Sequence, residues 1–375
     1  MMHRKTQLAA AVGAALVAFG TAAVAQAPAA ATVQVYGQVS RSILWADDGV
    51  QSKAFHVDNE SSGTRFGVTG TGQALPGLRA GFRIELDLQS NESQRVNFSP
   101  AGPVNDFPAT NPGQGFSERH MDAWVEGAWG RVNIGQGDGA ANGASESDLS
   151  GTGMANGIGV ADMGGGFVFR TAAGAFSPVN INGSVNQQDF ESRYDRLMYT
   201  TPTFGGFRAQ ASWGSKTNQD VKEISAWYGG KLGGLGELAA ALGWSQKDGT
   251  ATLAKDEYMG GSVSWLAGFG LNVTLSYTVR DTPVTLTTTR DSTFTYLKVG
   301  YKFGQHAIAV DYAMGDDFSA SGDEAKMYGI GYVWNPIRWL ELYGAYKIHQ
   351  LDRSAALGGS MQDITIAHIG TRVRF

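Results

Sequence analysis

The sequence contains no cysteine among its 375 residues, so disulfide bonds contribute nothing to the fold. It also has no long apolar run after Ala25 that could cross a membrane as a helix. The mean hydropathy is −0.18, which is ordinary for a water-soluble protein. A β-barrel in a membrane has the same composition, because only one face of each strand meets lipid.

Short catalytic and metal-binding motifs are missing as well. The sequence has no HExxH, GxSxG or calcium-loop spacing, and its six histidines are scattered. The run Gly164-Gly165-Gly166 lacks the Lys-Ser/Thr that follows in a phosphate-binding loop. The pairs Asp47-Asp48 and Asp316-Asp317 either bind a divalent cation at the surface or, as bare pairs more often do, bind nothing. We therefore expect no catalytic site, no cofactor and no metal centre.

Glycine and aromatic residues are abundant where other features are absent. The 52 glycines are about twice the share of an average protein, and 13 Tyr, 18 Phe and 9 Trp accompany them. Together they indicate many short strands with tight turns. Tryptophans cluster near the ends of the expected strands, as in the aromatic girdles of a membrane barrel, although each one alone is equally consistent with a core position.

The N-terminus resembles a secretory signal peptide. His3, Arg4 and Lys5 precede a run of small and apolar residues that ends in the cleavage pattern Ala23-Val24-Ala25. A transmembrane anchor is the alternative, but the run is rich in Ala and Gly and only weakly hydrophobic. We expect residues 1–25 to be removed and residues 26–375 to form one domain. Without Arg4 and Lys5 the mature chain has 27 basic against 34 acidic side chains, a net charge of −7.

Strict alternation of apolar and polar residues is the main structural signal. From Leu78 to Gln89 every even-numbered residue is apolar, whereas the odd-numbered ones are polar, charged or glycine. On a strand the two sets point to opposite faces. Twelve residues are long for a soluble sheet but suit a tilted membrane crossing of ~9–11 residues.

The same pattern recurs along the whole mature chain and predicts sixteen strands. They are 33–46, 62–72, 77–90, 116–127, 130–136, 191–201, 206–214, 221–232, 235–246, 256–266, 270–281, 291–303, 305–315, 324–335, 337–349 and 361–375. Tight turns alternate with longer polar connections at 47–61, 91–115, 137–190, 246–256, 281–291 and 350–360. An even strand count with short turns at one end and long loops at the other is typical of outer-membrane barrels.

Several motifs in this order resemble those of the Gram-negative general porins. They are Val35-Tyr36-Gly37, Ser62-Gly63-Thr64-Arg65-Phe66-Gly67-Val68, Gly77 to Glu85, Trp129 to Gln136, Arg193 to Tyr199, Thr201 to Phe207, and the terminal Phe375. The resemblance implies a trimeric, sixteen-stranded transmembrane barrel whose long third loop folds into the lumen. It implies passage of small hydrophilic solutes and ions, contact with outer-membrane lipid, no nucleic acid, and recognition of Phe375 by the barrel-assembly machinery.

A barrel of sixteen strands leaves a wide aqueous channel, so something must narrow it. Segment 137–190 is far longer than an ordinary hairpin loop and is the candidate, carrying Asp138, Glu146, Asp148 and Asp162. The alternative is an external disordered loop. In the family that the sequence resembles, the third loop folds inward, which favours a segment that narrows the channel over an external loop.

Basic residues on the wall are expected to face this loop. By alternation Arg65, Arg79, Arg83, Arg196 and Arg208 point inward, with Arg119 and Arg193 as further candidates. An arginine facing lipid at mid-bilayer costs ~2–4 kcal/mol, which requires the inward direction unless the strand register slips; the alternative for each is a solvated rim residue. The predicted constriction is formed by Arg65, Arg83, Arg196, Asp138, Glu146 and Asp148. The other predicted pore-lining residues are Arg79, Glu85, Arg119, Arg193 and Arg208.

The leading hypothesis is therefore a general diffusion channel. A substrate-preferring channel of the same fold stays open, because ion selectivity and preferred solute cannot be read from the residues. An outer-membrane barrel enzyme would need a Ser/His or Asp/His set, and none is apparent. A soluble periplasmic β-protein is the remaining alternative. Such a protein need not have its short turns at one end and its long loops at the other, as this sequence predicts.

Overall fold

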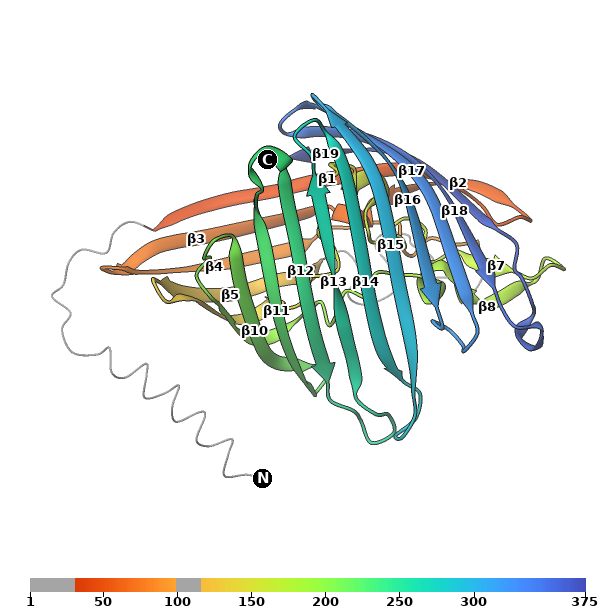
Figure 1. Ribbon diagram of the computed structural model, residues 1–375, viewed down its shortest axis with the longest axis horizontal. Helices are drawn as coiled ribbons and strands as arrows, with labels where there is room; N and C mark the ends of the chain where they lie inside the picture. The colour runs from red at the N-terminus through yellow and green to blue at the C-terminus, as the bar shows by residue number, and fades with distance from the viewer. Residues whose placement is uncertain (1–30, 99–115) are drawn as a thin grey trace.

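The computed structural model describes residues 31–98 and 116–375, and within them almost all regular structure is β-strand (Figure 1). The expected signal peptide and part of the expected loop 91–115 lie outside these residues. The strands of the main sheet are β1 (Thr32–Asp47), β2 (Ser52–Asp58), β3 (Arg65–Leu75), β4 (Leu78–Asp87), β5 (Ser117–Gly127), β6 (Gly130–Asp138), β9 (Arg193–Thr200), β10 (Phe207–Lys216), β11 (Gln219–Lys231), β12 (Glu237–Lys247), β13 (Asp256–Leu266), β14 (Leu271–Pro283), β15 (Thr289–Phe303), β16 (His306–Asp316), β17 (Glu324–Ile337), β18 (Leu340–Asp352) and β19 (Ile364–Arg374).

The sheet closes on itself because its first and last strands pair. β1 runs antiparallel to β19 from Gln38↔Arg374 to Asp47↔Thr365 without a register shift. On its other side β1 pairs with β2 near one end and with β3 near the other. β2 and β3 thus share one position in the wall, interrupted by η1 (Glu60–Ser62). Counted this way the seventeen strands make a sixteen-stranded antiparallel barrel, which confirms the predicted fold.

β2 is a strand where the sequence predicts part of a loop, 47–61, and that assignment is wrong. Its seven residues pair with β1 from Arg41↔Asp58 to Asp47↔Ser52. The polar run from Asp58 to Ser62 separates it from β3 and has the composition of a loop. Seven residues with little alternation give too weak a signal against such a neighbour.

Short turns and long connections lie at opposite ends of the barrel. The start of β1 and the end of β19 belong to the short-turn end, where Gly37 and Phe375 exchange two backbone hydrogen bonds of 3.1 Å. One tight connection occurs at the long-loop end. There Thr217 and Asn218, with φ of 51° and 63°, join β10 to β11 in a two-residue turn of the kind that matches strand twist.

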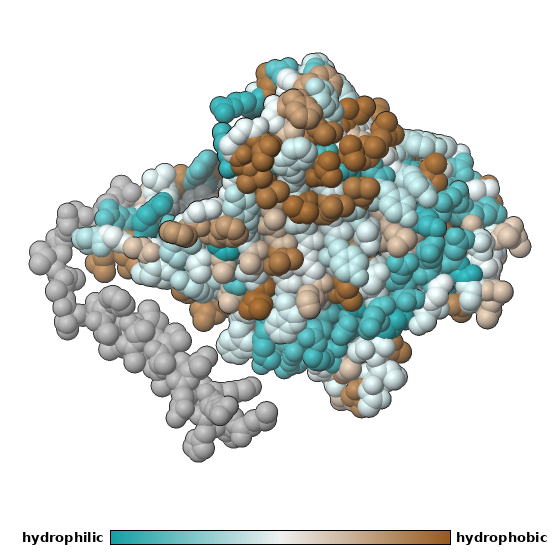
Figure 2. Space-filling view, in the orientation of Figure 1, coloured by the Kyte–Doolittle hydropathy of each residue, from teal (hydrophilic) through white to brown (hydrophobic). Residues whose placement is uncertain are grey.

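The two faces of the wall differ as the alternation requires. On β13 Met259 is exposed, whereas Ser262 and Ser264 are buried. The exposed face carries the large apolar side chains, and Figure 2 shows them gathered in the upper half of the surface in view. The buried face is rich in Ser, Thr and charged residues. The outer face is therefore suited to lipid and the inner face to water or polypeptide.

Residues 139–192, between β6 and β9, contain the remaining elements. They are α2 (Gly153–Asn156), β7 (Val168–Arg170), β8 (Phe176–Asn180) and α3 (Ile181–Ser184). Two further 3-10 turns, η2 (Gly233–Leu235) and η3 (Ala355–Leu357), lie in connections. None of the described helices has the length and hydrophobicity needed to cross a membrane.

The largest hydrophobic core lies between this segment and the wall. Met163, Phe167 and Phe169 from the segment are fully buried against a set of wall residues. That set comprises Leu44 on β1, Phe294 and Tyr296 on β15, Met327 on β17, and Ile364 and Ile366 on β19. The segment and the wall thus share one packed core.

Candidate functional site

Glu85 on β4 is the centre of a charged cluster on the inner face. Its carboxylate is 1% exposed, and three guanidinium groups approach it. Arg83 Nη2 lies 2.7 Å from Oε2, Arg119 Nε lies 2.8 Å from Oε1, and Arg65 Nη1 lies 3.7 Å from Oε1. Tyr36 Oη donates to the same carboxylate at 2.7 Å. One acid thus holds three cations from neighbouring strands close together.

Strand register places these groups side by side. Gly67 on β3 lies opposite Glu85, and a Cβ on Gly67 would come within 2.4 Å of the Tyr36 ring. The missing side chain is what lets Tyr36 reach the carboxylate. A register shift between β4 and β5 beside Glu85 explains why the side chain of Arg119 points inward, since a bulge turns an otherwise outward residue toward the inner face. Simple alternation left the direction of Arg119 open for this reason.

A second group forms where β6 ends and the long segment begins. Asp138 lies 3.6 Å from Arg193 Nη1 and 3.7 Å from His120 Nε2. Arg196 is buried and pairs with Asp122 at 2.8 Å. It also donates to the backbone oxygens of Asp138 and Gly135 at 2.8 Å and 2.6 Å. Arg196 therefore fixes the root of the segment, whereas Arg193 stays partly exposed.

The acids within the segment fall into two kinds. Asp148 lies against the wall, 2.8 Å from Lys298 Nζ on β15, and Lys298 is fully buried. Burial opposes ionisation of Asp148, yet the Lys298 charge and its hydrogen bond bring the net pKa below the usual value. An ionised Asp148 thus anchors the segment to β15.

Glu146, Asp162 and Asp189 behave differently. Glu146 is exposed to solvent and accepts a hydrogen bond from Gln187 at 3.0 Å. Surrounding protein nevertheless raises its pKa by desolvation. Desolvation, followed by the charge of Glu146, holds the pKa values of Asp162 and Asp189 well above the usual range. In all three acids desolvation thus favours the protonated, uncharged form.

Small hydroxyl side chains on the wall, which sequence reasoning missed, hold the segment. The Oγ atoms of Ser212, Ser262 and Ser264 accept hydrogen bonds from backbone N–H groups of the segment at 2.8–2.9 Å. Further contacts follow the wall around. Ser276 on β14 donates to the backbone oxygen of Ser145, and Gln188 donates to Ser292 on β15. Asn156 donates to Asp311 on β16, and His368 on β19 is hydrogen-bonded to the backbone oxygen of Ala155. The available signal was the run of inward-facing Ser and Thr on these strands.

Arg79 and Arg208 lie away from the Glu85 cluster, toward the short-turn end. Both are exposed and line a cavity of about 800 Å³ whose boundary includes Arg83, Asp138 and the turns at Ala128 and Pro202. The structure therefore groups the predicted residues into a charged cluster, a root of the segment and an open vestibule.

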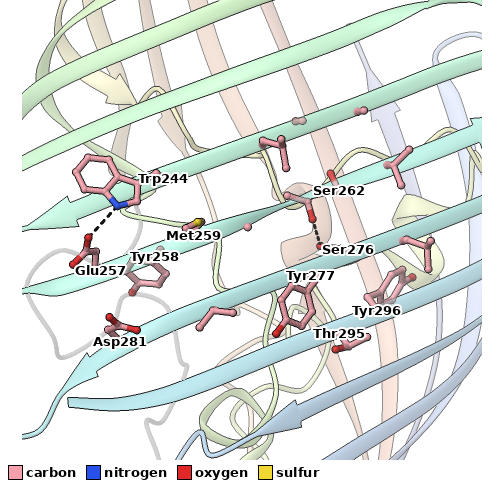
Figure 3. A pocket seen from close by; sticks show the side chains of 18 residues that line it. Trp244, Glu257, Tyr258, Met259, Ser262, Ser276, Tyr277, Asp281, Thr295 and Tyr296 are labelled. Carbon is pink, nitrogen blue, oxygen red and sulfur yellow. Dashed lines mark hydrogen bonds between the residues drawn. The ribbon is translucent and has the colours of Figure 1, made fainter. Parts of the chain in front are cut away.

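A different hollow lies in the wall and is lined mainly by apolar side chains. Its volume is about 940 Å³, and it occurs over Gly260 and Gly261 on β13, between outward-facing Leu242 and Tyr277. Figure 3 shows Trp244 at one end, with its Nε1 donating to Glu257 at 3.0 Å. This hollow contains none of the predicted pore residues.

A profile of the Gram-negative porins matches residues 9–353. The chain belongs to this family. Members are channels of the Gram-negative outer membrane rather than enzymes, so this porin provides a path for diffusion of small solutes. Its short-turn end is the periplasmic one.

Solved porins have the same fold. The anion-selective porin from Comamonas acidovorans aligns with a TM-score of 0.63 at 20% identity, covering 92% of this chain and 100% of that one. The trimer form of OmpT from Vibrio cholerae gives 0.58 at 13% identity, with coverages of 92% and 100%. The channel DcaP of Acinetobacter baumannii gives 0.58 at 12% identity, with coverages of 92% and 97%. Comparison with curated proteins finds no match.

The Glu85 cluster predicts that neutralising Glu85 lowers the free energy of unfolding more than neutralising an acid outside the cluster. Glu85→Gln leaves three guanidiniums without their common counter-charge and should lower the free energy of unfolding by about 1–3 kcal/mol, because a buried partner is lost while solvent still screens the arginines. Glu126→Gln is the matched control, since among the described residues Glu126 pairs with half-exposed Arg131 alone, and it should change the free energy of unfolding by less than ~1 kcal/mol. Denaturant unfolding of the purified porin measures both. Equal effects would contradict a special role for Glu85.

Proposed function

We propose that residues 139–192 lie across the lumen and, with the wall arginines, form the narrowest part of a general diffusion channel. Their hydrogen bonds to the wall support this, because they involve the face opposite the apolar, lipid-facing one. The full burial of Phe167 and Phe169 also supports the proposal, because the segment packs as folded protein against the wall.

The proposed constriction places Arg65, Arg83 and Arg119 on one side, and partly exposed Asp138 at the end of β6 with exposed Glu146 of the segment on the other. Opposed charges produce a transverse field, which low-dielectric walls screen less than bulk solvent would. Such a field favours hydrated dipolar solutes and disfavours apolar ones. Passage needs no gate or energy source, because solutes must leave as readily as they enter.

We propose a moderate preference for anions. The cluster contains three guanidiniums against Glu85 and Asp87, and Arg79 and Arg208 add positive charge toward the periplasm. The pKa values of Asp162 and Asp189, held well above the usual range by desolvation, favour the uncharged forms of these two acids and so weaken the opposing negative charge. The Comamonas relative is described as anion-selective. A preferred substrate is not required by any of these observations.

We propose a homotrimer, as in the trimer form of the Vibrio relative. Arg41 shares the outer face with Val39 and Ile43 and pairs with buried Asp58 at 2.6 Å. Its register with β19 is unbroken, so no bulge turns it inward. A partly exposed charge is better placed against a neighbouring subunit than against lipid. Light scattering of the detergent-solubilised porin should give three times the mass of one chain, and the mass of one chain would contradict the proposal.

Two proposals concern export. Residues 1–25 act as a signal peptide, and Phe375 is recognised by the assembly machinery. N-terminal sequencing of the exported protein should begin near Gln26. Phe375→Ala should lower the amount of assembled barrel in the outer membrane. An uncleaved N-terminus or an unchanged yield would contradict the respective proposal.

Arg65→Ala tests the proposed constriction. Loss of one cluster guanidinium should shift the reversal potential in a salt gradient toward cations and alter single-channel conductance. The free energy of unfolding should fall by less than ~1 kcal/mol, because Arg65 is partly solvated and Glu85 keeps two closer partners. Arg338→Ala, in the exposed turn between β17 and β18, is the control and should change neither electrical quantity. Deleting the centre of segment 139–192 should raise conductance.

If Arg65→Ala and the deletion both left conductance and reversal potential unchanged in planar bilayers, the constriction would lie elsewhere. The channel assignment itself would survive that result, because it rests on the family match and the barrel.

A further inference from the structure

Arg79 and Arg208 differ from the other inward-facing arginines. Within residues 31–98 and 116–375, each of Arg65, Arg83, Arg119, Arg131, Arg193 and Arg196 lies within 4 Å of a carboxylate. Arg79 instead donates to the hydroxyl of Thr71 at 3.3 Å, and Arg208 has no carboxylate partner in the same part of the chain. Their charges are therefore available to a passing solute.

Each of these two arginines lies beside an inward-facing tryptophan. The guanidinium carbon of Arg79 is 6.0 Å from the ring centre of Trp124, and that of Arg208 is 5.0 Å from the ring centre of Trp227. Trp124 shares the inner face of β5 with Asp122, the partner of Arg196. Trp227 shares the inner face of β11 with Ser225, whose Oγ accepts from its Nε1 at 2.8 Å. Neither indole is a lipid-facing girdle residue.

Arg79, Trp124 and Arg208 line the same cavity of about 800 Å³ at the periplasmic end. The acids that line it are already paired. Asp122 contacts Arg196, Glu126 contacts Arg131, and Asp138 contacts Arg193. The space thus combines a cavity of small-molecule size, two uncompensated guanidiniums and the indole of Trp124, over which the guanidinium of Arg131 also lies at 4.1 Å from the ring centre.

We propose that this vestibule is a weak binding subsite for planar organic anions, in particular aromatic carboxylates. The inference rests on the proposed passage of solutes through the lumen and adds a class of solute to it. The carboxylate pairs with the guanidinium of Arg79 or Arg208, which are suited to planar, two-point contacts. The ring packs against the indole of Trp124, the tryptophan that lines the cavity. Weak binding is compatible with transport, since a tightly held solute would block the pore.

The test uses the intact porin in planar bilayers with benzoate as the probe. Cyclohexanecarboxylate is the matched control solute, because it has the same charge and a similar size but no planar ring. Each is added on the periplasmic side, and apparent affinity is measured from the interruptions of the potassium chloride current. Benzoate should interrupt the current at lower concentration than cyclohexanecarboxylate.

Two sets of variants separate charge from stacking. The double variant Arg79→Gln/Arg208→Gln should weaken the binding of both solutes by about fivefold. Trp124→Leu should weaken benzoate binding by about two- to fivefold and leave cyclohexanecarboxylate unchanged. Arg338→Gln, which removes a guanidinium from a turn at the same end, should change neither affinity. The single variants Arg79→Gln and Arg208→Gln replace the double variant if it fails to assemble.

Equal affinities for the two solutes in the unmodified porin would overturn the preference for planar anions. Unchanged affinities in the arginine variants would overturn the location. Both results leave the potassium chloride conductance intact and so leave the proposed function standing. A porin that gave no such conductance at all would contradict the proposed function instead.

Discussion

The pairing of β1 with β19 is the constraint on which the rest of this structure depends. A strand in a bilayer has no water to satisfy its backbone, so the sheet must have no free edge within the membrane. Ten residue pairs between the first and last strands meet that requirement. Closure with sixteen positions then leaves an interior too wide for side chains alone to fill. The narrowing and the packing of that interior have to come from another part of the chain.

Residues 139–192 supply the packing, and in the proposed function they also supply the narrowing. Their apolar side chains, such as Phe167 and Phe169, form the main core against the wall. Their backbone groups are satisfied by serines of β10 to β14, whose small side chains allow close approach. The three arginines of the Glu85 cluster lie instead on β3, β4 and β5. The serines that hold the segment and the guanidiniums of this cluster therefore occupy different strands of the inner face.

Much of this follows from period-two alternation, which is a local property of the chain. It predicts the barrel, the strand positions and the inward direction of Arg65, Arg79, Arg83, Arg196 and Arg208. It misses β2, because a short interrupted strand beside polar residues has no clear alternation, and it leaves Arg119 open, because a bulge is set by the neighbouring strand. The pairing of Asp148 with Lys298 joins residues 150 positions apart, and no local pattern encodes it. Which acids face solvent depends on such contacts.

The central claim is that the long segment narrows the lumen, and the absence of native cysteine makes a direct measurement possible. Glu146→Cys places a single thiol on the exposed part of the segment, and Val284→Cys places one on the exposed turn between β14 and β15. Both are labelled to completion with the same bulky thiol reagent, and single-channel conductance is recorded before and after. We predict that conductance falls in the Glu146→Cys porin and stays unchanged in the Val284→Cys porin. Unchanged conductance in a fully labelled Glu146→Cys porin would contradict the claim.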